Sequence, residues 1–272
     1  MSESRDWRKV RAEVKDFVEN EVYPAEAVLN QRSEESNQKL KELMDKAKEK
    51  NLWALGHPVD IGGQGMPFME YVYVNEVVGR SSPAMVALGT HSLQDSIMLR
   101  EFASDRWREA YLGPLVAGEI FPSFGMTEPD TASSDPTQLQ TAAVLEDGEW
   151  VINGRKWFTS GAARAAYTTV MVRTEPDTPG HGAFSMIIVP TDNPGYKIVR
   201  ETPVLGINGG HYEVEYDNVI AKILAISKNR TDTRIYVRGD KTINYGRVLE
   251  VMGTLSGAGF SKVALISEPY KN

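Results

Sequence analysis

The feature that most constrains this chain is a change of hydrophobic pattern near Glu119. Upstream, apolar residues recur at the three- and four-residue spacing of amphipathic helices, over 10–22 and again over 40–47. Downstream, short runs rich in β-branched and aromatic residues alternate with turn residues about every ten positions. The chain has 272 residues, enough for roughly two domains with cores of their own. The pattern predicts a helical part followed by a strand-rich part.

The strand-rich part begins with a hairpin pattern, in which residues 142–145 and 150–153 flank a turn at 146–149. Further strands are predicted over 167–173, 184–189 and 211–219. In the last of these, Tyr212, Val214 and Tyr216 are expected to face the core. The alternating acidic residues are expected to face solvent: Glu213, Glu215 and Asp217. Short strands at this spacing predict a sandwich or a barrel of about 100 residues.

From residue 220 the pattern changes again. Segments 220–227 and 245–255 look helical, and segments 234–238 and 262–267 look like strands, which predicts a small α/β unit. Residues 220–272 carry nine Lys or Arg against four Asp or Glu, whereas the whole chain has a net charge of -7. This asymmetry indicates a third unit of separate origin.

Composition excludes several classes of protein. The chain has no Cys, which removes disulfide frameworks, thiolate nucleophiles and iron–sulfur clusters, and its four scattered His predict no metal site. The acidic balance argues against a nucleic-acid-binding protein. The first residues show no apolar signal segment, and no stretch approaches the ~18 apolar residues of a membrane helix. We therefore expect a cytoplasmic protein without a membrane span.

Two segments carry residues suited to holding a polar cofactor. Residues 121–135 bring hydroxyls, Gly and Pro into one loop, and residues 153–161 bring a tryptophan, two hydroxyls and a glycine together. Such loops offer N–H and O–H donors. From residue types alone, ordinary turns and a core tryptophan explain both segments better than a cofactor site does.

Together the two segments resemble the acyl-CoA dehydrogenase family. Gly125-Met-Thr-Glu-Pro followed by Ala132-Ser-Ser-Asp135 is similar to the family's first signature, and Lys156-Trp-Phe-Thr-Ser-Gly161 is similar to its second. The helical N-terminal part, the loop at 58–65 and the closing strand at 209–219 occur in the expected order. Residues 130–135 replace a shorter, glycine-rich version, which indicates a different branch of the family. The resemblance covers about 1–219.

The resemblance implies an α+β multidomain chain: an N-terminal helical domain at 1–118, a middle FAD-binding β-barrel at 119–219, and a separate segment at 220–272. It implies oxidation of an acyl-CoA to the trans-2-enoyl-CoA, with electrons passed to an electron-transfer flavoprotein. It also implies a homo-oligomer or a self-associating chain.

The resemblance assigns eight cofactor contacts: Phe124, Met126, Thr127, Ser133, Ser134, Trp157, Thr159 and Ser160. The first three are expected to line the flavin. Ser133 and Ser134 are expected at the diphosphate, with Ser134 also at the mouth of the acyl-CoA site. Trp157 is expected against the isoalloxazine ring, and Thr159, with Ser160 beside it, near flavin N5. Donors at that edge would stabilise the anion that forms when the flavin accepts hydride.

The same reaction needs a base for the proton α to the thioester carbonyl. In the family this carboxylate lies in a third, helical C-terminal domain, which the sequence is expected to lack. The resemblance therefore predicts a truncated enzyme of weak or no activity, with no catalytic residue assigned. Glu128 belongs to the first signature, but a carboxylate that structures its loop is the better interpretation.

Residues 220–268 resemble the end of the periplasmic domain of ExbD/TolR biopolymer-transport proteins. The resemblance rests on a strand ending in an acidic turn, a Tyr245-Gly246 helix and a final Val263-Ala-Leu strand. A diverged dehydrogenase tail is the alternative. Two other functions therefore stay open: a flavin or acyl-CoA binding module without turnover, and an interaction module for a cell-envelope complex.

Two further patterns are interpreted as structural. Ser36 and Lys39 fit the Ser-x-x-Lys spacing of acyl-serine enzymes without the companion motifs, so chance explains them. His91 precedes an apolar helix and is expected to be a capping or core histidine.

Overall fold

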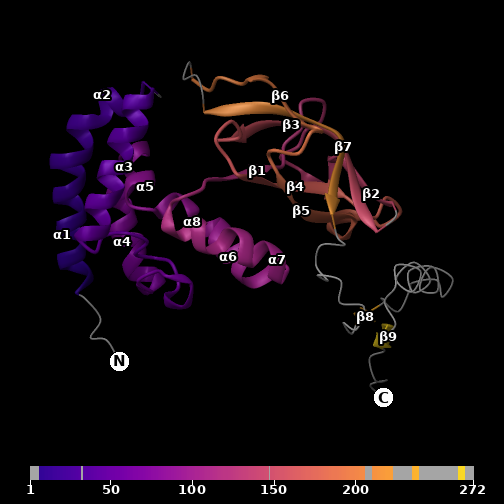
Figure 1. The fold of residues 1–272 in the computed structure, drawn as a ribbon, viewed down its shortest axis with the longest axis horizontal. Helices are drawn as coiled ribbons and strands as arrows, with labels where there is room; N and C mark the ends of the chain where they lie inside the picture. Colours follow the sequence, from indigo (N-terminus) through magenta and orange to yellow (C-terminus); the bar gives the residue numbers. More distant parts are fainter. Residues whose placement is uncertain are drawn as a thin grey trace. The chain divides into compact units, whose positions relative to one another are not determined.

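The computed structural model describes residues 6–31, 33–146, 148–205, 210–222, 235–238 and 263–266 (Figure 1). The chain forms two compact units. We call the first the helical unit; it comprises 1–124, 160–168 and 201–212. We call the second the sheet unit; it comprises 125–159, 169–200 and 213–272. Each unit is described by itself.

The helical unit is built from α-helices joined by short π and 3-10 turns. The α-helices are α1 (Trp7–Phe17), α2 (Glu26–Leu29), α3 (Glu34–Glu49), α4 (Phe68–Val78), α5 (Ser82–Ala87), α6 (Leu93–Phe102), α7 (Asp105–Trp107) and α8 (Gly113–Ala117). The π turns are η1 (Val18–Val22) and η5 (Arg108–Leu112), and the 3-10 turns are η2 (Tyr23–Ala25), η3 (Val59–Ile61) and η4 (Thr90–Ser92).

The predicted apolar stripe at 10–22 becomes the buried face of α1 and η1. The Asp6 side chain caps α1 by accepting the Arg8 N–H at 3.0 Å. Val10, Val14 and Phe17 are buried on one side of the helix. The helical turns continue through η1 to Val22, and the stripe ends there, as predicted, at the 3-10 turn that contains Pro24.

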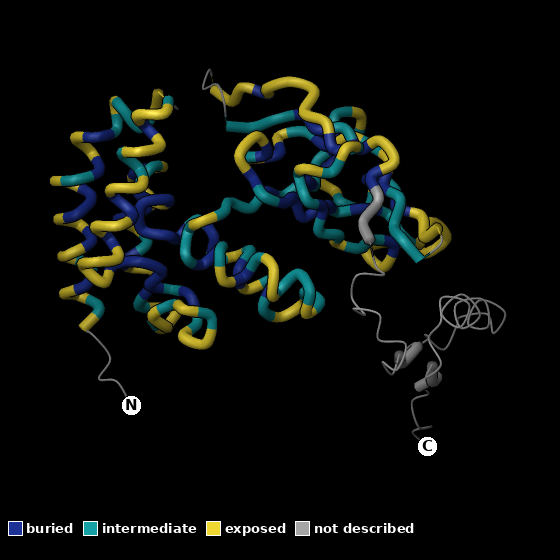
Figure 2. The backbone as a smooth tube through the Cα atoms, in the orientation of Figure 1, coloured by how far each residue is buried: buried dark blue, intermediate teal, exposed yellow. Residues whose placement is uncertain are grey.

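The second stripe lies on α3, where Leu43, Met44 and Ala47 are buried. Figure 2 shows both helices with buried and exposed turns alternating along their length. Ser33 caps α3 by accepting the Ser36 N–H at 3.2 Å, and the Ser36 hydroxyl returns a hydrogen bond to the Ser33 carbonyl at 2.7 Å. Ser36 is therefore part of a helix start, in agreement with its interpretation as a chance match.

One curled seven-stranded sheet belongs mainly to the sheet unit, and its residues 122–124, 160, 167–168, 201 and 211–212 are counted in the helical unit. Its strands are β1 (Pro122–Gly125), β2 (Ala142–Glu146), β3 (Glu149–Ser160), β4 (Tyr167–Arg173), β5 (Phe184–Pro190), β6 (Tyr196–Glu201) and β7 (His211–Lys222). The order across the sheet is β1-β4-β2-β3-β7-β6, and β5 also pairs with β4 (Figure 1). The 3-10 turns η6 (Pro136–Gln138) and η7 (Gly180–Ala183) lie between strands.

The predicted hairpin is confirmed. β2 and β3 pair antiparallel, with Ala142 opposite Asn153 and Glu146 opposite Glu149. Gly154 lies next to this register at φ +148°, and a Cβ there would lie 2.7 Å from the Thr141 backbone. Glycine is needed at this point because the chains approach so closely.

The expected polar face of β7 is wrong at one position. Glu213 is buried with 1% of its surface exposed, on the same strand as the buried Val214 and Tyr216. Its carboxylate is paired with the guanidinium groups of Arg155 on β3 and Arg200 on β6. Alternation predicts which residues face out, but two arginines from neighbouring strands provide the charge that lets this carboxylate face in.

The tail shows a second correction. The helix expected at 220–227 is wrong for 220–222, which continue β7 as a strand. Beyond it the structure describes β8 (Ile235–Arg238) and β9 (Val263–Ile266), which pair parallel with Ile235 opposite Val263. The remainder of the ExbD/TolR-like segment, including the helix expected at 245–255, lies outside the described residues.

Candidate functional site

The first signature follows β1 in the sheet unit and is held by a buried ion pair. The Lys156 ammonium, with no exposed surface, lies 2.8 Å from Glu128 Oε1 and donates to the Met126 carbonyl at 2.9 Å. The Glu128 carboxylate also accepts the backbone N–H groups of Gln140 at 2.7 Å and Thr141 at 2.9 Å. One carboxylate thus joins the signature, the start of β2 and the middle of β3. Glu128 structures its loop, as the sequence suggested.

Burial and pairing act in opposite directions on the two charges. Burial raises the pKa of the Glu128 carboxyl, but hydrogen bonds from Lys156 and from the Gln140 backbone outweigh it and hold the pKa below its ordinary value. Burial lowers the pKa of the Lys156 ammonium, and the pairing with Glu128 offsets only part of that effect. The pair is satisfied on both sides, so the loop has a rigid base.

A second clamp ties the signature to β3. The backbone N–H of Trp157 donates to the Thr127 carbonyl at 2.9 Å. The Thr127 hydroxyl in turn donates to the Trp157 carbonyl at 2.8 Å. Farther along the loop, the Ser133 hydroxyl accepts the Glu128 N–H at 2.8 Å and is itself buried. The side chains of Thr127 and Ser133 therefore hold the loop together, and their cofactor contacts stay predictions.

The end of β3 presents an aromatic ring and a hydroxyl to solvent. Phe158 is 41% exposed and adopts a left-handed backbone with φ +49°. Ser160 is exposed, whereas Thr159 between them has no exposed surface and its hydroxyl has no hydrogen-bond partner. A non-glycine residue at positive φ is uncommon and costs backbone strain. The strained turn exposes Phe158 and Ser160 and buries Thr159.

The structure brings some of the predicted contacts together. Met126, Thr127 and Trp157 meet through the Lys156 ammonium and the backbone clamp. The remaining predicted residues take no part in these contacts: Phe124 on β1, Ser133 and Ser134 in the loop, Thr159 inside β3, and Ser160 at its end. Ser134 is exposed and Phe124 is half-buried.

Sequence reasoning did not single out Lys156 or Phe158 in the sheet unit, or the contact between His211 and Ser160 in the helical unit. Lys156 and Phe158 stand inside the second signature, so their position was a signal, but burial and exposure could not be read from it. His211 lies 51 residues from Ser160 in sequence, and its Nδ1 is 2.8 Å from the Ser160 Oγ. No local pattern connects them.

His91 is half-buried with structural contacts, in agreement with the expectation of a capping or core histidine. Its ring packs on Phe121 with 5.3 Å between centroids, and both ring nitrogens are buried without a hydrogen-bond partner. Burial, with a smaller contribution from the Arg164 charge, lowers the pKa of His91 to about 4. Within the described ranges, no three His, Asp or Glu side chains cluster as metal ligands would.

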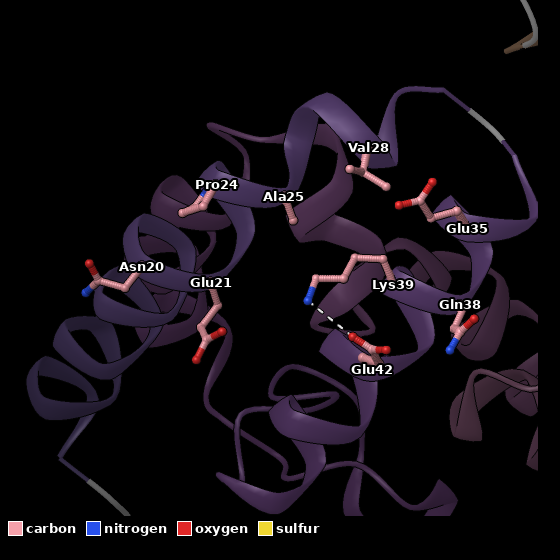
Figure 3. Close-up of a pocket in the computed structure, with 9 residues that line it drawn as sticks. All are labelled: Asn20, Glu21, Pro24, Ala25, Val28, Glu35, Gln38, Lys39 and Glu42. Carbon is pink, nitrogen blue, oxygen red and sulfur yellow. Dashed lines mark hydrogen bonds and ion pairs between the residues drawn. The ribbon is translucent and has the colours of Figure 1, made fainter.

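The helical unit also has an open cavity of about 550 Å³ between the η1–α2 segment and α3 (Figure 3). Its lining includes Glu21, Glu35, Lys39 and Glu42, and Lys39 is paired with Glu42 at 3.2 Å. None of the predicted cofactor contacts lines it. Nor does any helix in the described part of the chain combine the length and apolar character needed to cross a bilayer.

Comparison with known families assigns most of the chain to one family. Residues 4–119 match the acyl-CoA dehydrogenase N-terminal domain, and residues 123–219 match the acyl-CoA dehydrogenase middle domain. These residues belong to the acyl-CoA dehydrogenase family, as its N-terminal and middle domains. The family assignment explains the order of helical unit, clamped loop and curled sheet.

Individual relatives agree with this assignment. The chain is 36% identical over 223 residues to FadE2 of Mycobacterium tuberculosis, assigned to the acyl-CoA dehydrogenases, covering 77% of this chain and 54% of that protein. It is 34% identical to acyl-CoA dehydrogenase family member 10 of Mus musculus, covering 78% of this chain and 21% of that protein. The chain thus spans about half the length of the first relative, and less of the second.

Solved structures show the same fold. A Mycobacterium abscessus structure assigned to the acyl-CoA dehydrogenases superposes with a TM-score of 0.73 at 32% identity, covering 81% of this chain and 59% of that one. A glutaryl-CoA dehydrogenase from Mycobacterium smegmatis, solved with FADH2, superposes with a TM-score of 0.61 at 21% identity, covering 80% of this chain and 54% of that one.

Proposed function

We propose that this chain binds FAD through its middle domain and takes part in the α,β-dehydrogenation of an acyl-CoA thioester. When bound, FAD supplies the hydride acceptor. The observation that carries the proposal is the end of β3, where an aromatic ring and a hydroxyl are exposed next to a loop fixed by a buried ion pair. A flavin needs such a flat apolar surface and a hydrogen-bonding edge.

The residues present fit this cofactor. The exposed Phe158 ring would lie at the isoalloxazine, and the exposed Ser160 hydroxyl would lie beside the N5 edge. Trp157 and Thr159 keep the roles that the resemblance assigns to them: Trp157 against the isoalloxazine, and Thr159 near N5, where its buried hydroxyl has no other hydrogen-bond partner. An ordered, preset donor at the flavin edge would stabilise developing negative charge without reorganisation.

The other predicted contacts are carried forward as part of the proposal. Phe124, Met126 and Thr127 would border the flavin, mainly through backbone groups because the Thr127 hydroxyl is engaged with Trp157. Ser134, which is exposed, would reach the diphosphate and the mouth of the acyl-CoA site. Ser133 would act there by shaping the loop. We place the domain boundaries of this proposal at 118/119 and 219/220.

The base for the α-proton stays unassigned in this proposal. Glu128 is the carboxylate of the first signature, but Lys156 and two backbone N–H groups engage it and hold it inside the unit. A base must reach a substrate proton within hydrogen-bonding distance, which Glu128 does not offer. We therefore propose weak turnover for this chain acting alone.

Partners follow from the same chemistry. An acyl-CoA would be the substrate, and an electron-transfer flavoprotein would take the electrons from the reduced cofactor. Solved relatives include an assembly named the Tcur3481-Tcur3483 steroid acyl-CoA dehydrogenase, which has a TM-score of 0.64 at 28% identity and covers 80% of this chain and 55% of that one. We propose association with further copies of this chain, in the cytoplasm.

The test is direct. The purified 272-residue protein is loaded with FAD, desalted, and examined by visible absorption before and after a panel of acyl-CoAs is added without oxygen. Retained flavin that bleaches supports a dehydrogenase; retained flavin without bleaching supports a binding module without turnover. Loss of all flavin on desalting overturns the proposal.

A matched pair of variants locates the site. Phe158→Ala should weaken FAD binding by about tenfold, because a ring contact of this kind is worth roughly 1 kcal/mol or more. Phe102→Ala removes a phenylalanine that is 84% exposed on α6 and should leave FAD binding unchanged. Equal effects of the two variants would contradict the assignment of Phe158.

A further inference from the structure

Two arginines of the sheet unit converge on one buried carboxylate. Glu213 on β7 has 1% of its surface exposed, and β7 lies between β3 and β6 in the sheet. Arg155 on β3 donates to Glu213 Oε1, and Arg200 on β6 donates from its Nε to Glu213 Oε2 at 2.7 Å. The side chains of the two arginines are 45% and 58% exposed. Both therefore reach solvent, while the carboxylate that joins them does not.

The strands that carry the two arginines are fixed to β7 on both sides. Toward β3, the Asn218 N–H donates to the Asn153 side-chain oxygen at 2.9 Å. Toward β6, the Asp217 N–H donates to the Gly195 carbonyl at 3.0 Å. Both guanidinium groups are therefore tied to a carboxylate whose own position the sheet sets. Arginine side chains held in this way lose less conformational entropy when a ligand binds.

The pairing leaves both charge and hydrogen-bond donors unused. One arginine would neutralise one carboxylate, so the cluster of Arg155, Glu213 and Arg200, with two positive charges and one negative charge, keeps a net charge of +1. Arg155 uses only Nη2 in this pairing, and Arg200 uses only Nε. Among the residues that the structure describes, no further acceptor binds either guanidinium group. A guanidinium group has five N–H donors, so most of them are left for an acceptor from outside.

Unused N–H groups on two neighbouring cations are suited to an anion with several oxygens. We propose that Arg155 and Arg200, both tied to Glu213, form an anion site that takes a phosphate group. The planar guanidinium fork matches two oxygens of a phosphate, and a phosphate has enough oxygens to face both arginines, whereas a carboxylate has only two. A monoanionic phosphate, such as either phosphate of a diphosphate ester, would neutralise the net charge of +1. Inorganic pyrophosphate and CoA both carry this chemistry, and the inference does not depend on flavin binding.

Isothermal titration calorimetry of the purified 272-residue chain tests the site with two probes, inorganic pyrophosphate and CoA. The variants are Arg155→Lys and Arg200→Lys, because lysine keeps a positive charge beside Glu213 but lacks the planar fork. We expect each variant to weaken the binding of at least one probe by about tenfold, the size of one lost charge-assisted hydrogen bond. Added salt should weaken the binding to wild type, since exposed charges are screened. Each titration is made well below the thermal midpoint of the variant, so that unfolding does not contribute.

Arg100→Lys is the matched control. Arg100 on α6 is 37% exposed, and its Nε lies 2.6 Å from Asp60 Oδ2, so the same substitution there should change neither affinity. Pyrophosphate binding that both lysine variants weaken supports the site and shows that a bare phosphate is enough. The same loss with CoA alone supports a site for a phosphate carried by a nucleotide. Absence of binding of either probe to wild type, wild-type affinity in Arg155→Lys and Arg200→Lys, or an equal loss in Arg100→Lys overturns the inference.

Discussion

Two carboxyl groups, a half-buried one in the helical unit and a buried one in the sheet unit, behave in opposite ways. In the helical unit, partial burial raises the pKa of Asp95 on α6 to about 6, and a hydrogen bond from its own backbone offsets this only in part. In the sheet unit, Lys156 and backbone donors hold the pKa of the buried Glu128 carboxyl below its ordinary value. The ionised carboxylate is therefore destabilised at Asp95 and stabilised at Glu128.

The difference between the two carboxyl groups follows from whether a buried or half-buried polar group has a partner of opposite charge. Both units bury polar groups that have no hydrogen-bond partner, such as Ser96 and Tyr167 in the helical unit and Thr159 and Tyr216 in the sheet unit. The sheet unit contains paired charges: Glu128 with Lys156, and Glu213 with two arginines. The hydrogen bonds of a paired charge fix the orientation of the groups that they join, whereas apolar packing is non-directional. The signature loop is positioned by such a pair.

The largest effect that tests this comparison is expected from Lys156→Met. The variant fills a similar volume but leaves the Glu128 carboxylate buried without its cation. Loss of one partner of a buried pair costs roughly 3–5 kcal/mol. We expect the free energy of unfolding, measured by urea denaturation, to fall by about this amount, and FAD binding to fall with it.

The Glu128→Gln/Lys156→Met double variant is the control for that result. It removes both charges, so the desolvation cost of the unpaired carboxylate disappears, and stability should recover by more than half. A double variant as unstable as Lys156→Met would show that packing at these positions, rather than charge pairing, holds the loop.

Substitution of Asp95 is expected to change the free energy of unfolding less than Lys156→Met does, and in the opposite direction. Because its folded pKa is raised, the folded protein binds more protons than the unfolded chain between about pH 4 and 6, so stability falls as pH rises through that window. Asp95→Asn should raise the free energy of unfolding at pH 7 by roughly 1–3 kcal/mol. It should also flatten the dependence on pH between pH 4 and 6. Denaturation curves across that range check both; a variant no more stable than wild type at pH 7 would contradict the sign.

The smallest effect is expected from an exposed pair in the sheet unit. Lys197 on β6 lies 2.9 Å from Asp217 on β7, and both side chains are about half exposed. Solvent and salt screen such a pair, and the flexible side chains lose entropy in forming it. Lys197→Ala should leave the thermal midpoint within measurement error at physiological salt. A loss comparable with that of Lys156→Met would mean that pairing matters in this unit regardless of burial.

Much of the fold could be predicted from local pattern. Apolar residues at helical spacing predicted α1 and α3, and a turn between two runs with strand patterns predicted the β2–β3 hairpin. The two signatures identified the family because they depend on short, specific strings of residues. The expectations that failed concern Glu213 and residues 220–222, where pairing with neighbouring strands outweighs local preference.

The candidate site was predictable in position and less so in detail. The second signature lies at the end of β3, but which of its side chains are exposed could not be deduced from the sequence. Regular alternation places Phe158 and Thr159 on opposite faces without saying which face is covered. The left-handed backbone at Phe158 then breaks the regular pattern, so exposure depends on the folded chain.

The sequence by itself determined where helices give way to strands, which family the first 219 residues belong to, and which loop carries the signature. Only the tertiary structure decided that Lys156 is buried, that Thr159 faces inward, and that His211 contacts Ser160. The physical reason is distance along the chain: Lys156 meets Glu128 across 28 residues and Ser160 meets His211 across 51. The state of a buried or paired polar group depends on partners that no local window of sequence contains.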